Sequence, residues 1–197
     1  MQLIDTVFVD MDGTVADFVG GCAAWFGQPH PFEGNDKPGT WDFFEQWGIP
    51  CNTFWQGIDS VRFWETLPVT HDARGMMNVL LDNFLPSQIC FLTGNKITAN
   101  AVEGKKRWAK KHFGAHNILF AQQGYTARNP KSHCAAPGHL LVDDLWDNCV
   151  AWRDAGGRAF QVSRPWNQAE VDIESSNARV LDDLLHFNRT FNQEPVQ

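Results

Sequence analysis

Two pairs of aspartates follow apolar runs in the sequence, and their spacing suggests chemistry at strand ends. Asp10 and Asp12 lie in the stretch VFVDMD, and Asp143 and Asp144 end the stretch HLLVDD. In an open parallel sheet, ligands bind beyond the carboxyl ends of the strands, so the two pairs are expected to converge there. Two carboxylates about 4 Å apart repel by roughly 4 kcal/mol at an effective dielectric constant near 20. Converging carboxylates therefore predict a bound cation.

The side chains available for this cation indicate Mg²⁺. They are hard oxygen ligands, and no pair of histidines or cysteines accompanies them, which argues against zinc. A single DxD motif is a weak signal, because aspartate is common in turns that follow strands. Two such pairs, one of them followed by Gly13 and Thr14, are harder to explain as turns.

A third apolar run, ICFL, is followed by groups that could bind phosphate. Thr93 offers a hydroxyl and Gly94 an unencumbered backbone N–H, and both can donate to a phosphate, although Thr-Gly is also an ordinary turn. Lys131, shortly before the second acidic pair, would supply a fixed cation, with Arg128 and Lys96 as alternatives. The remaining lysines of this region are interpreted as the solvated face of a helix: Lys105, Lys106, Lys110 and Lys111.

The elements that must position these residues alternate along the chain. After an apolar strand at 7–9, strands are expected at 88–92, 117–121, 139–142 and 158–162, and helices at 72–84, 97–112, 145–155 and 178–187. Strands separated by helices require crossover connections and a mostly parallel sheet with both faces covered. The fold class predicted is therefore α/β with a Rossmann-like core.

Residues 28–68 do not follow this alternation of strands and helices, and their composition predicts an inserted cap. The segment holds five prolines and nine aromatic side chains, and a connection this long in a compact domain usually has a function. The expected organisation is a core of residues 1–27 and 69–197 with a small, largely helical cap of residues 28–68. Most of the rings are expected to form the cap's own core, and two or three to face a ligand.

Composition limits the partners and the compartment. The chain has 197 residues, a formal charge of −7 and a pI near 5.4, so no nucleic acid polymer and no membrane is expected as a partner. No signal sequence or apolar run of transmembrane length is evident. The five cysteines lack a CxxC pair and are expected as buried thiols in a reducing compartment: Cys22, Cys51, Cys90, Cys134 and Cys149. A cytoplasmic protein is predicted, and a homodimer is left open.

The order of DMDGT, LTG, a lysine and LLVDD resembles the four motifs of the haloacid dehalogenase-like (HAD) hydrolase superfamily. A closer likeness is to the 5′(3′)-deoxyribonucleotidase family, which the chain resembles in DMDGTVADF, in RFWETLP at 62–68 and in RWAKKHFG at 107–114. One departure is the sequence Thr-Gly-Asn at 93–95, where that family usually has Thr-Ser-Pro. The resemblance implies a HAD core with a small cap inserted after the first strand and helix.

The resemblance also implies roles for the site residues. Asp10 would attack phosphorus and form an aspartyl-phosphate, and Asp12 would act as general acid and then as general base. Mg²⁺ would be held by Asp10, the backbone carbonyl of Asp12 and Asp143. The phosphoryl oxygens would be bound by Thr93, Gly94 and Lys131.

The expected substrate contacts come from aromatic residues near the cap. Phe18 follows the catalytic motif, and Phe63 and Trp64 lie where the cap returns to the core. Packing at the hinge is the alternative interpretation of these rings. Asp144 is left open between a metal ligand and a residue that supports the ligands.

The function predicted is a Mg²⁺-dependent phosphomonoesterase acting on nucleoside monophosphates, in particular 5′(3′)-deoxyribonucleotides. One alternative is a phosphatase of another small phosphate ester, such as a sugar phosphate. The other is a HAD-fold binding protein without turnover. In the superfamily that the motifs resemble, dehalogenating members lack the second aspartate, so Asp12 favours phosphate chemistry.

Overall fold

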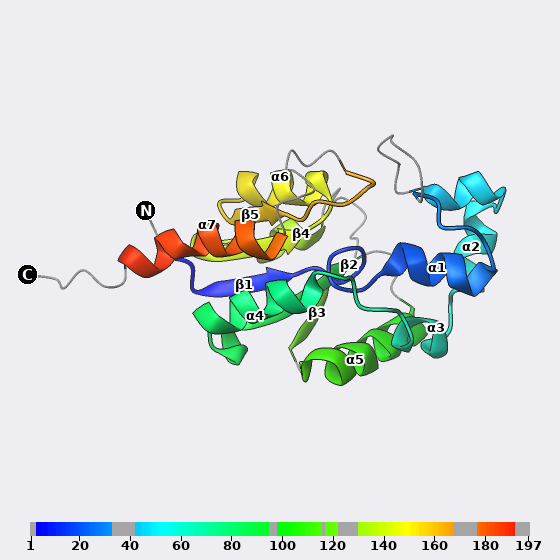
Figure 1. The fold of residues 1–197 in the computed structure, drawn as a ribbon, viewed down its shortest axis with the longest axis horizontal. Helices are drawn as coiled ribbons and strands as arrows, with labels where there is room; N and C mark the ends of the chain where they lie inside the picture. The colour runs from blue at the N-terminus through cyan, green and yellow to red at the C-terminus, as the bar shows by residue number, and fades with distance from the viewer. Residues whose placement is uncertain are drawn as a thin grey trace, which may run out of the picture.

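A parallel β-sheet forms the centre of the protein (Figure 1). The computed structural model describes residues 3–32, 42–94, 98–115, 117–121, 130–167 and 177–191. Within these ranges the sheet has five strands in the order β3-β2-β1-β4-β5, and every neighbouring pair is parallel. The strands are β1 (Thr6–Val9), β2 (Ile89–Gly94), β3 (Ile118–Ala121), β4 (His139–Asp143) and β5 (Arg158–Gln161). They point toward the end of the molecule that carries the inserted helices.

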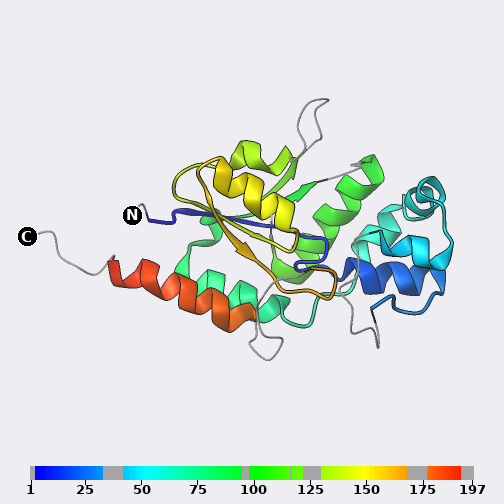
Figure 2. The same cartoon turned by 90° about the horizontal axis from the view of Figure 1, so that it is seen from above.

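Helices cover both faces of the sheet, which confirms the Rossmann-like α/β fold. They are α4 (Ala73–Asn83), α5 (Ala99–Phe113), α6 (Trp146–Asp154) and α7 (Asn177–Phe191), with short 3-10 helices η2 (Pro86–Gln88) and η3 (Pro130–Cys134). Figure 2 shows α4 and α7 side by side on one face and α6 on the other. Among the described residues, no helix is both long and apolar enough to cross a membrane.

The alternation of side chains in β1 explains why the sheet is buried on both sides. Val7 and Val9 point into a large core shared with α4 and α7. Phe8 points the other way, into a smaller core with Leu141 and Trp152. Because successive side chains of a strand face opposite sides of the sheet, this short run places Asp10 at the carboxyl edge between two apolar layers.

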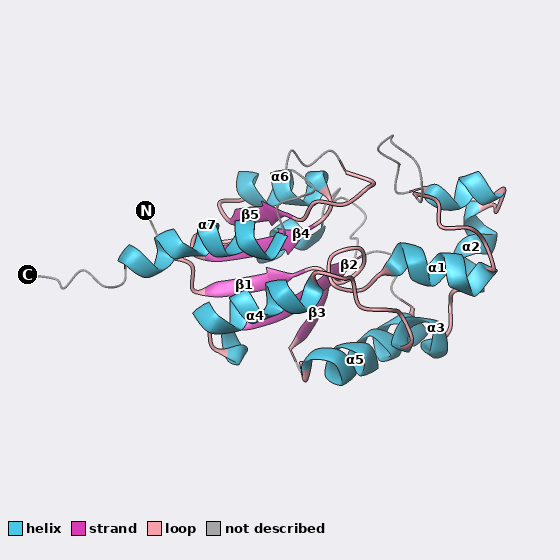
Figure 3. Cartoon of the chain, viewed as in Figure 1, coloured by secondary structure: helices cyan, strands magenta, loops and turns pink. Residues whose placement is uncertain are grey.

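The described parts of the inserted segment, residues 28–32 and 42–68, consist of short helices and loops (Figure 3). They contain η1 (Phe43–Trp47), α2 (Cys51–Gly57) and α3 (Val61–Glu65). Helix α1 (Phe18–Phe26), which the sequence analysis assigned to the core, lies beside them. Phe18 stacks with Trp64 at a centroid distance of 5.7 Å and meets Phe54 edge-on at 6.4 Å. These contacts pack the start of α1 against α2 and α3.

The two chain crossings between core and cap are hydrogen-bonded to each other. Asp17 N donates to Pro68 O at 2.8 Å, and Thr70 N donates to Val15 O at 3.0 Å. Ala16 forms backbone bridges with both Asp12 and Val69. The loop that carries Asp12 therefore continues directly into the connection to the cap.

The five cysteines form no disulfide. Burial raises the pKa of the thiols of Cys22, Cys90, Cys134 and Cys149, so these thiols are poorly ionised near neutral pH. Cys51 differs in position because it is exposed at the start of α2 in the cap.

Candidate active site

Three aspartates converge at the carboxyl edge of the sheet. Asp10 follows β1 and Asp143 ends the neighbouring strand β4, with Asp144 next to it. One carboxylate oxygen from each of the three lies within 4.8 Å of the others, and all three side chains are buried. Asp10 of the first acidic pair and both aspartates of the second thus meet at the edge where ligands bind in this class of sheet.

Lys131 lies between two of these carboxylates. It comes from η3, is buried, and its Nζ donates to Asp10 Oδ1 and, at 2.7 Å, to Asp143 Oδ2. Burial alone would lower the pKa of Lys131, but the two carboxylates outweigh it and hold the pKa above its usual range. The ammonium therefore stays charged. The alternative cations Arg128 and Lys96 lie outside the described residues.

The three carboxyl groups carry more negative charge than one lysine offsets. Burial raises the pKa of Asp10, Asp143 and Asp144, although Lys131 acts in the opposite direction. Repulsion raises the pKa further, from Asp12 at Asp10, from Asp10 at Asp143, and from Asp143 and Asp10 at Asp144. Buried hard-oxygen donors this close together fit a divalent cation such as Mg²⁺. The side-chain cluster contains Asp144, for which the sequence left two roles open, metal ligand or support of the ligands.

Neighbouring groups hold Asp144 in place. Its Oδ1 accepts a hydrogen bond from Thr14 Oγ1 at 3.1 Å, and its Oδ2 accepts one from Trp166 Nε1 at 2.5 Å. Gly13 has φ of +84°, and a Cβ there would lie 2.7 Å from Asp144 Oδ2. Only glycine therefore lets the loop that carries Asp12 pass this close to the end of β4.

Arg164 holds the same loop by hydrogen bonds to its backbone carbonyls. This residue was not predicted from the sequence. Its guanidinium donates to the carbonyls of Gly13 at 2.6 Å and Thr14 at 2.7 Å. It also forms a bidentate pair with Asp72 at 2.8 and 2.9 Å, and Asn177 donates to Asp72 at 2.6 Å. Arg164 follows the end of β5, and a cation at a strand end next to the acidic strand is the signal that could have found it.

Lys105 corrects the interpretation of the lysine-rich helix. The sequence analysis placed it on the solvated face of α5, but its exposed fraction is only 3%. Lys106, Lys110 and Lys111 are exposed, as predicted. The available signal was the helical spacing, because Lys105 falls within the buried stripe Ala101, Gly104, Lys105, Trp108 and Ala109.

The other catalytic and phosphate-binding candidates lie beside the aspartate cluster. Lys105 Nζ contacts Asp12 Oδ2 and donates to Thr93 Oγ1 at 2.6 Å. Thr93 is fully buried near the end of β2. Gly94 faces Lys131, since a Cβ on Gly94 would lie 3.6 Å from Lys131 Cε. The structure therefore brings the proposed acid, the hydroxyl, the backbone N–H and the fixed cation to one edge.

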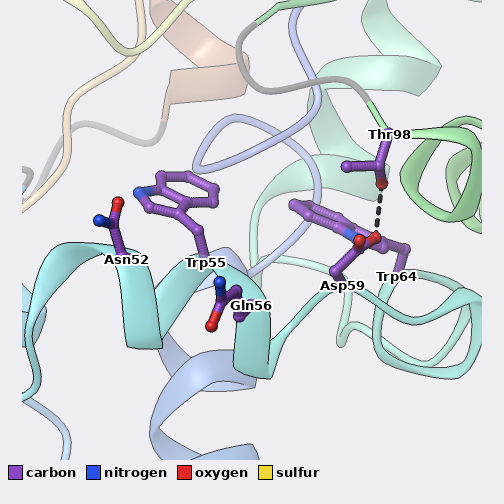
Figure 4. Close-up of a pocket in the computed structure, with 6 residues that line it drawn as sticks. All are labelled: Asn52, Trp55, Gln56, Asp59, Trp64 and Thr98. Atoms are coloured by element: carbon purple, nitrogen blue, oxygen red, sulfur yellow. Dashed lines mark hydrogen bonds between the residues drawn. The ribbon is translucent and has the colours of Figure 1, made fainter.

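A pocket of about 200 Å³ opens where the cap meets α5 (Figure 4). It is lined by Asn52, Trp55, Gln56, Asp59, Trp64 and Thr98. A hydrogen bond of 2.6 Å from Thr98 Oγ1 to Asp59 Oδ1 closes one side of it. The indole nitrogen of Trp64 is buried and has no hydrogen-bond partner among the described residues.

Of the three rings expected to contact substrate, only Trp64 lines this pocket. Phe18 and Phe63 are each 1% exposed and meet edge-on at 6.1 Å within the aromatic core of the cap. This arrangement matches the alternative interpretation of those two rings as packing. Trp55, which was not singled out from the sequence, supplies the second wall.

Comparison with solved structures identifies the fold. A haloacid dehalogenase-like family hydrolase from Xanthomonas campestris is 10% identical, with a TM-score of 0.54 over 98% of this chain and 100% of its own. A HAD family hydrolase from Deinococcus radiodurans with bound phosphate and sodium is 15% identical, with a TM-score of 0.54 over 94% and 97%. A Bacillus subtilis HAD hydrolase bound to magnesium is 13% identical, with a TM-score of 0.52 over 95% and 99%.

These similarities show that the chain has the HAD-like fold. A scan against protein-family models finds no match, and a search of curated proteins finds none. The superfamily resemblance of the four motifs therefore agrees with the fold, while the relation to 5′(3′)-deoxyribonucleotidases stays a prediction from the sequence.

Proposed function

We propose that the protein is a Mg²⁺-dependent phosphomonoesterase that hydrolyses nucleoside monophosphates, with 5′(3′)-deoxyribonucleotides as the expected substrates. The observation that carries the proposal is the buried cluster of Asp10, Asp143 and Asp144 with Lys131 between two of its members. It combines a nucleophile, a site for a divalent cation and a fixed positive charge, the groups that phosphoryl transfer requires.

In the first step, a carboxylate oxygen of Asp10 attacks phosphorus and the bond from phosphorus to the ester oxygen breaks. Asp12 lies two residues further along the chain, and its carboxyl group would give the leaving oxygen a proton. Lys131, Thr93 Oγ1 and the N–H of Gly94 would stabilise the charge on the transferred phosphoryl group.

In the second step, water attacks the phosphorus of the aspartyl-phosphate. Asp12, now ionised, accepts a proton from that water, and the bond between phosphorus and Asp10 breaks to release phosphate. The residues that would hold Mg²⁺ are Asp10, Asp143 and the backbone carbonyl of Asp12, with Asp144 beside them. When bound, Mg²⁺ would supply Lewis-acid stabilisation of the phosphoryl oxygens.

The pocket between Trp55 and Trp64 supports a substrate with a flat ring. Its volume of about 200 Å³ is below the roughly 300–1,000 Å³ of most ligand pockets, so it suits one ring system of a larger substrate. The half-buried indole of Trp55 offers stacking surface, and the amides of Asn52 and Gln56 can bond to the edge of a base. Trp64 connects the pocket to the catalytic groups, because Lys105 Nζ lies 4.7 Å from the centroid of its ring.

Phosphate release from a panel of esters would test this proposal. The panel contains ribo- and deoxyribonucleoside monophosphates with 5′- and 3′-phosphates, together with sugar phosphates, each with Mg²⁺ and with a chelator. We expect the highest kcat/KM for a nucleotide and loss of turnover in the chelator. Faster turnover of a sugar phosphate would favour the alternative ester. No release from any ester would favour a binding protein.

Truncating the pocket rings tests the proposed base contact. Trp55→Ala should lower kcat/KM for a nucleotide by roughly tenfold to a hundredfold, since stacking contributes about 1–3 kcal/mol per base. Glycerol phosphate, which has no ring to stack, should be affected much less. Trp25→Ala is the matched control, because Trp25 is a partly exposed cap tryptophan that packs on Phe63 outside the pocket. Equal losses on both substrates for Trp55→Ala would mean that the ring only stabilises the cap.

A further inference from the structure

Lys105 is the one lysine of α5 among the described residues that is turned into the protein. A buried ammonium is costly unless charged or polar partners compensate it. Lys105 has such partners on two different elements, namely Asp12 on the catalytic loop and Thr93 on β2. It also lies 4.7 Å above the ring of Trp64 from the cap.

The helix is able to reach this position because of Gly104. A Cβ on Gly104 would lie 2.5 Å from Trp64 Cβ and 2.8 Å from the carbonyl oxygen of Val61. Glycine at this position lets α5 pack directly on α3, and the next residue then enters the site. Trp108, one turn further along, donates from Nε1 to Leu67 O at 2.7 Å and fixes the same helix to the chain that leaves the cap.

The donor pattern of the ammonium determines how both partners are oriented. An ammonium has three hydrogens to donate and no lone pair, so Thr93 Oγ1 must accept from Lys105. The hydroxyl hydrogen of Thr93 therefore remains available to donate elsewhere. In the same way, Lys105 engages Oδ2 of Asp12 and leaves Oδ1 as the oxygen without a partner among the described residues.

We infer that Lys105 is a positioning residue that aligns the general acid and the phosphate-binding hydroxyl at the same time. This inference rests on the proposed phosphomonoesterase function. Lys105 holds the Asp12 carboxyl group through Oδ2 in the orientation for proton transfer to the leaving oxygen, and it leaves the hydroxyl hydrogen of Thr93 to donate to the phosphoryl group. It acts through these two residues and takes no part in bond making itself.

A comparison of two leaving groups tests the inference. Phenyl phosphate and 4-nitrophenyl phosphate have similar shapes, but phenoxide is the stronger base and depends more on protonation by Asp12. The quantity to measure is kcat/KM with Mg²⁺, because it covers the steps up to formation of the aspartyl-phosphate. Lys105→Met should lower kcat/KM for phenyl phosphate by a factor on the order of 10² or more. The factor for 4-nitrophenyl phosphate should be about ten times smaller.

Lys110→Met is the matched control, since Lys110 is exposed on the same helix, and it should leave both values unchanged. The ratio of the two kcat/KM values decides the result even if Lys105→Met is less stable, because loss of folded enzyme lowers both by the same factor. Equal losses on the two esters, or no loss, would overturn the positioning role while leaving the phosphomonoesterase proposal intact. A parent enzyme inactive on both esters and on the nucleotide panel would overturn the proposed function and this inference with it.

Discussion

Asp10→Asn is expected to reduce turnover of any phosphate ester by at least about 10³-fold. An amide cannot form the acyl-phosphate, so the loss should appear in kcat while substrate binding persists. The fold should tolerate the change well. Burial and repulsion from Asp12 raise the pKa of the Asp10 carboxyl, so a neutral side chain relieves an unfavourable charge, and Lys131 retains its bond to Asp143. The melting temperature should therefore stay close to that of the parent.

Asp17→Asn is the matched control for this variant. Asp17 is the N-cap of α1, where its carboxylate accepts a hydrogen bond from Gly20 N at 2.9 Å, and asparagine caps helices about equally well. We expect parent-like turnover for Asp17→Asn. A beryllofluoride adduct should form on Asp10 of the parent and be absent from Asp10→Asn. If Asp10→Asn, checked by mass spectrometry for deamidation, keeps more than a few per cent of the parent's turnover, Asp10 is not the nucleophile.

Arg164→Met is expected to lower the free energy of unfolding by about 3–5 kcal/mol, the usual cost of removing one partner of a buried ion pair. The substitution keeps much of the volume of the side chain but leaves the buried Asp72 carboxylate without its bidentate partner, although Asn177 still donates to it. It also removes the donors to the carbonyls of Gly13 and Thr14. Urea denaturation at neutral pH would measure the change.

The pH dependence adds a second test of this ion pair. Burial would raise the pKa of Asp72, but hydrogen bonding and charge from Arg164 outweigh it and hold the pKa below its usual range. Such a group contributes stability above its unfolded pKa of about 4 and loses it as the pH falls through the lower folded value. The difference between parent and Arg164→Met should therefore shrink on acidification.

A surface pair provides the contrast for this measurement. Arg107 bonds to Glu103 and Glu65 on the exposed side of α5, where screening by water leaves little net stabilisation. Arg107→Met should hardly change the urea midpoint. If the urea midpoint of Arg164→Met is as close to that of the parent as the midpoint of Arg107→Met is, the buried pair does not stabilise the fold.

Local pattern was sufficient to predict the elements of the core. Alternation and helical period predicted a helix at 72–84 and a strand at 139–142, and the structure has α4 at Ala73–Asn83 and β4 at His139–Asp143. Strand β2 was expected to end at residue 92, but it continues through Gly94. Thr93 and Gly94 therefore lie within the strand and are held by its ladder with β3.

The local sequence pattern could not predict contacts between distant segments. Arg164 lies about 150 residues beyond the loop carbonyls that it binds and 92 residues beyond Asp72. A polar residue within an apolar helical stripe, as at Lys105, indicates burial, but nothing in the local sequence identifies its partners. In the cap, clustered rings predicted an aromatic core without indicating that Phe18 would lie inside it and Trp55 at the pocket.

The exposed position of Cys51 makes the cap accessible to site-selective labelling. The other four thiols are buried or partly buried and have raised pKa values, and a thiol reacts with electrophiles as its thiolate. A maleimide dye should therefore attach first at the start of α2, next to Asn52 in the wall of the pocket. The sequence thus provides an attachment point for a fluorophore beside the pocket without any engineered cysteine.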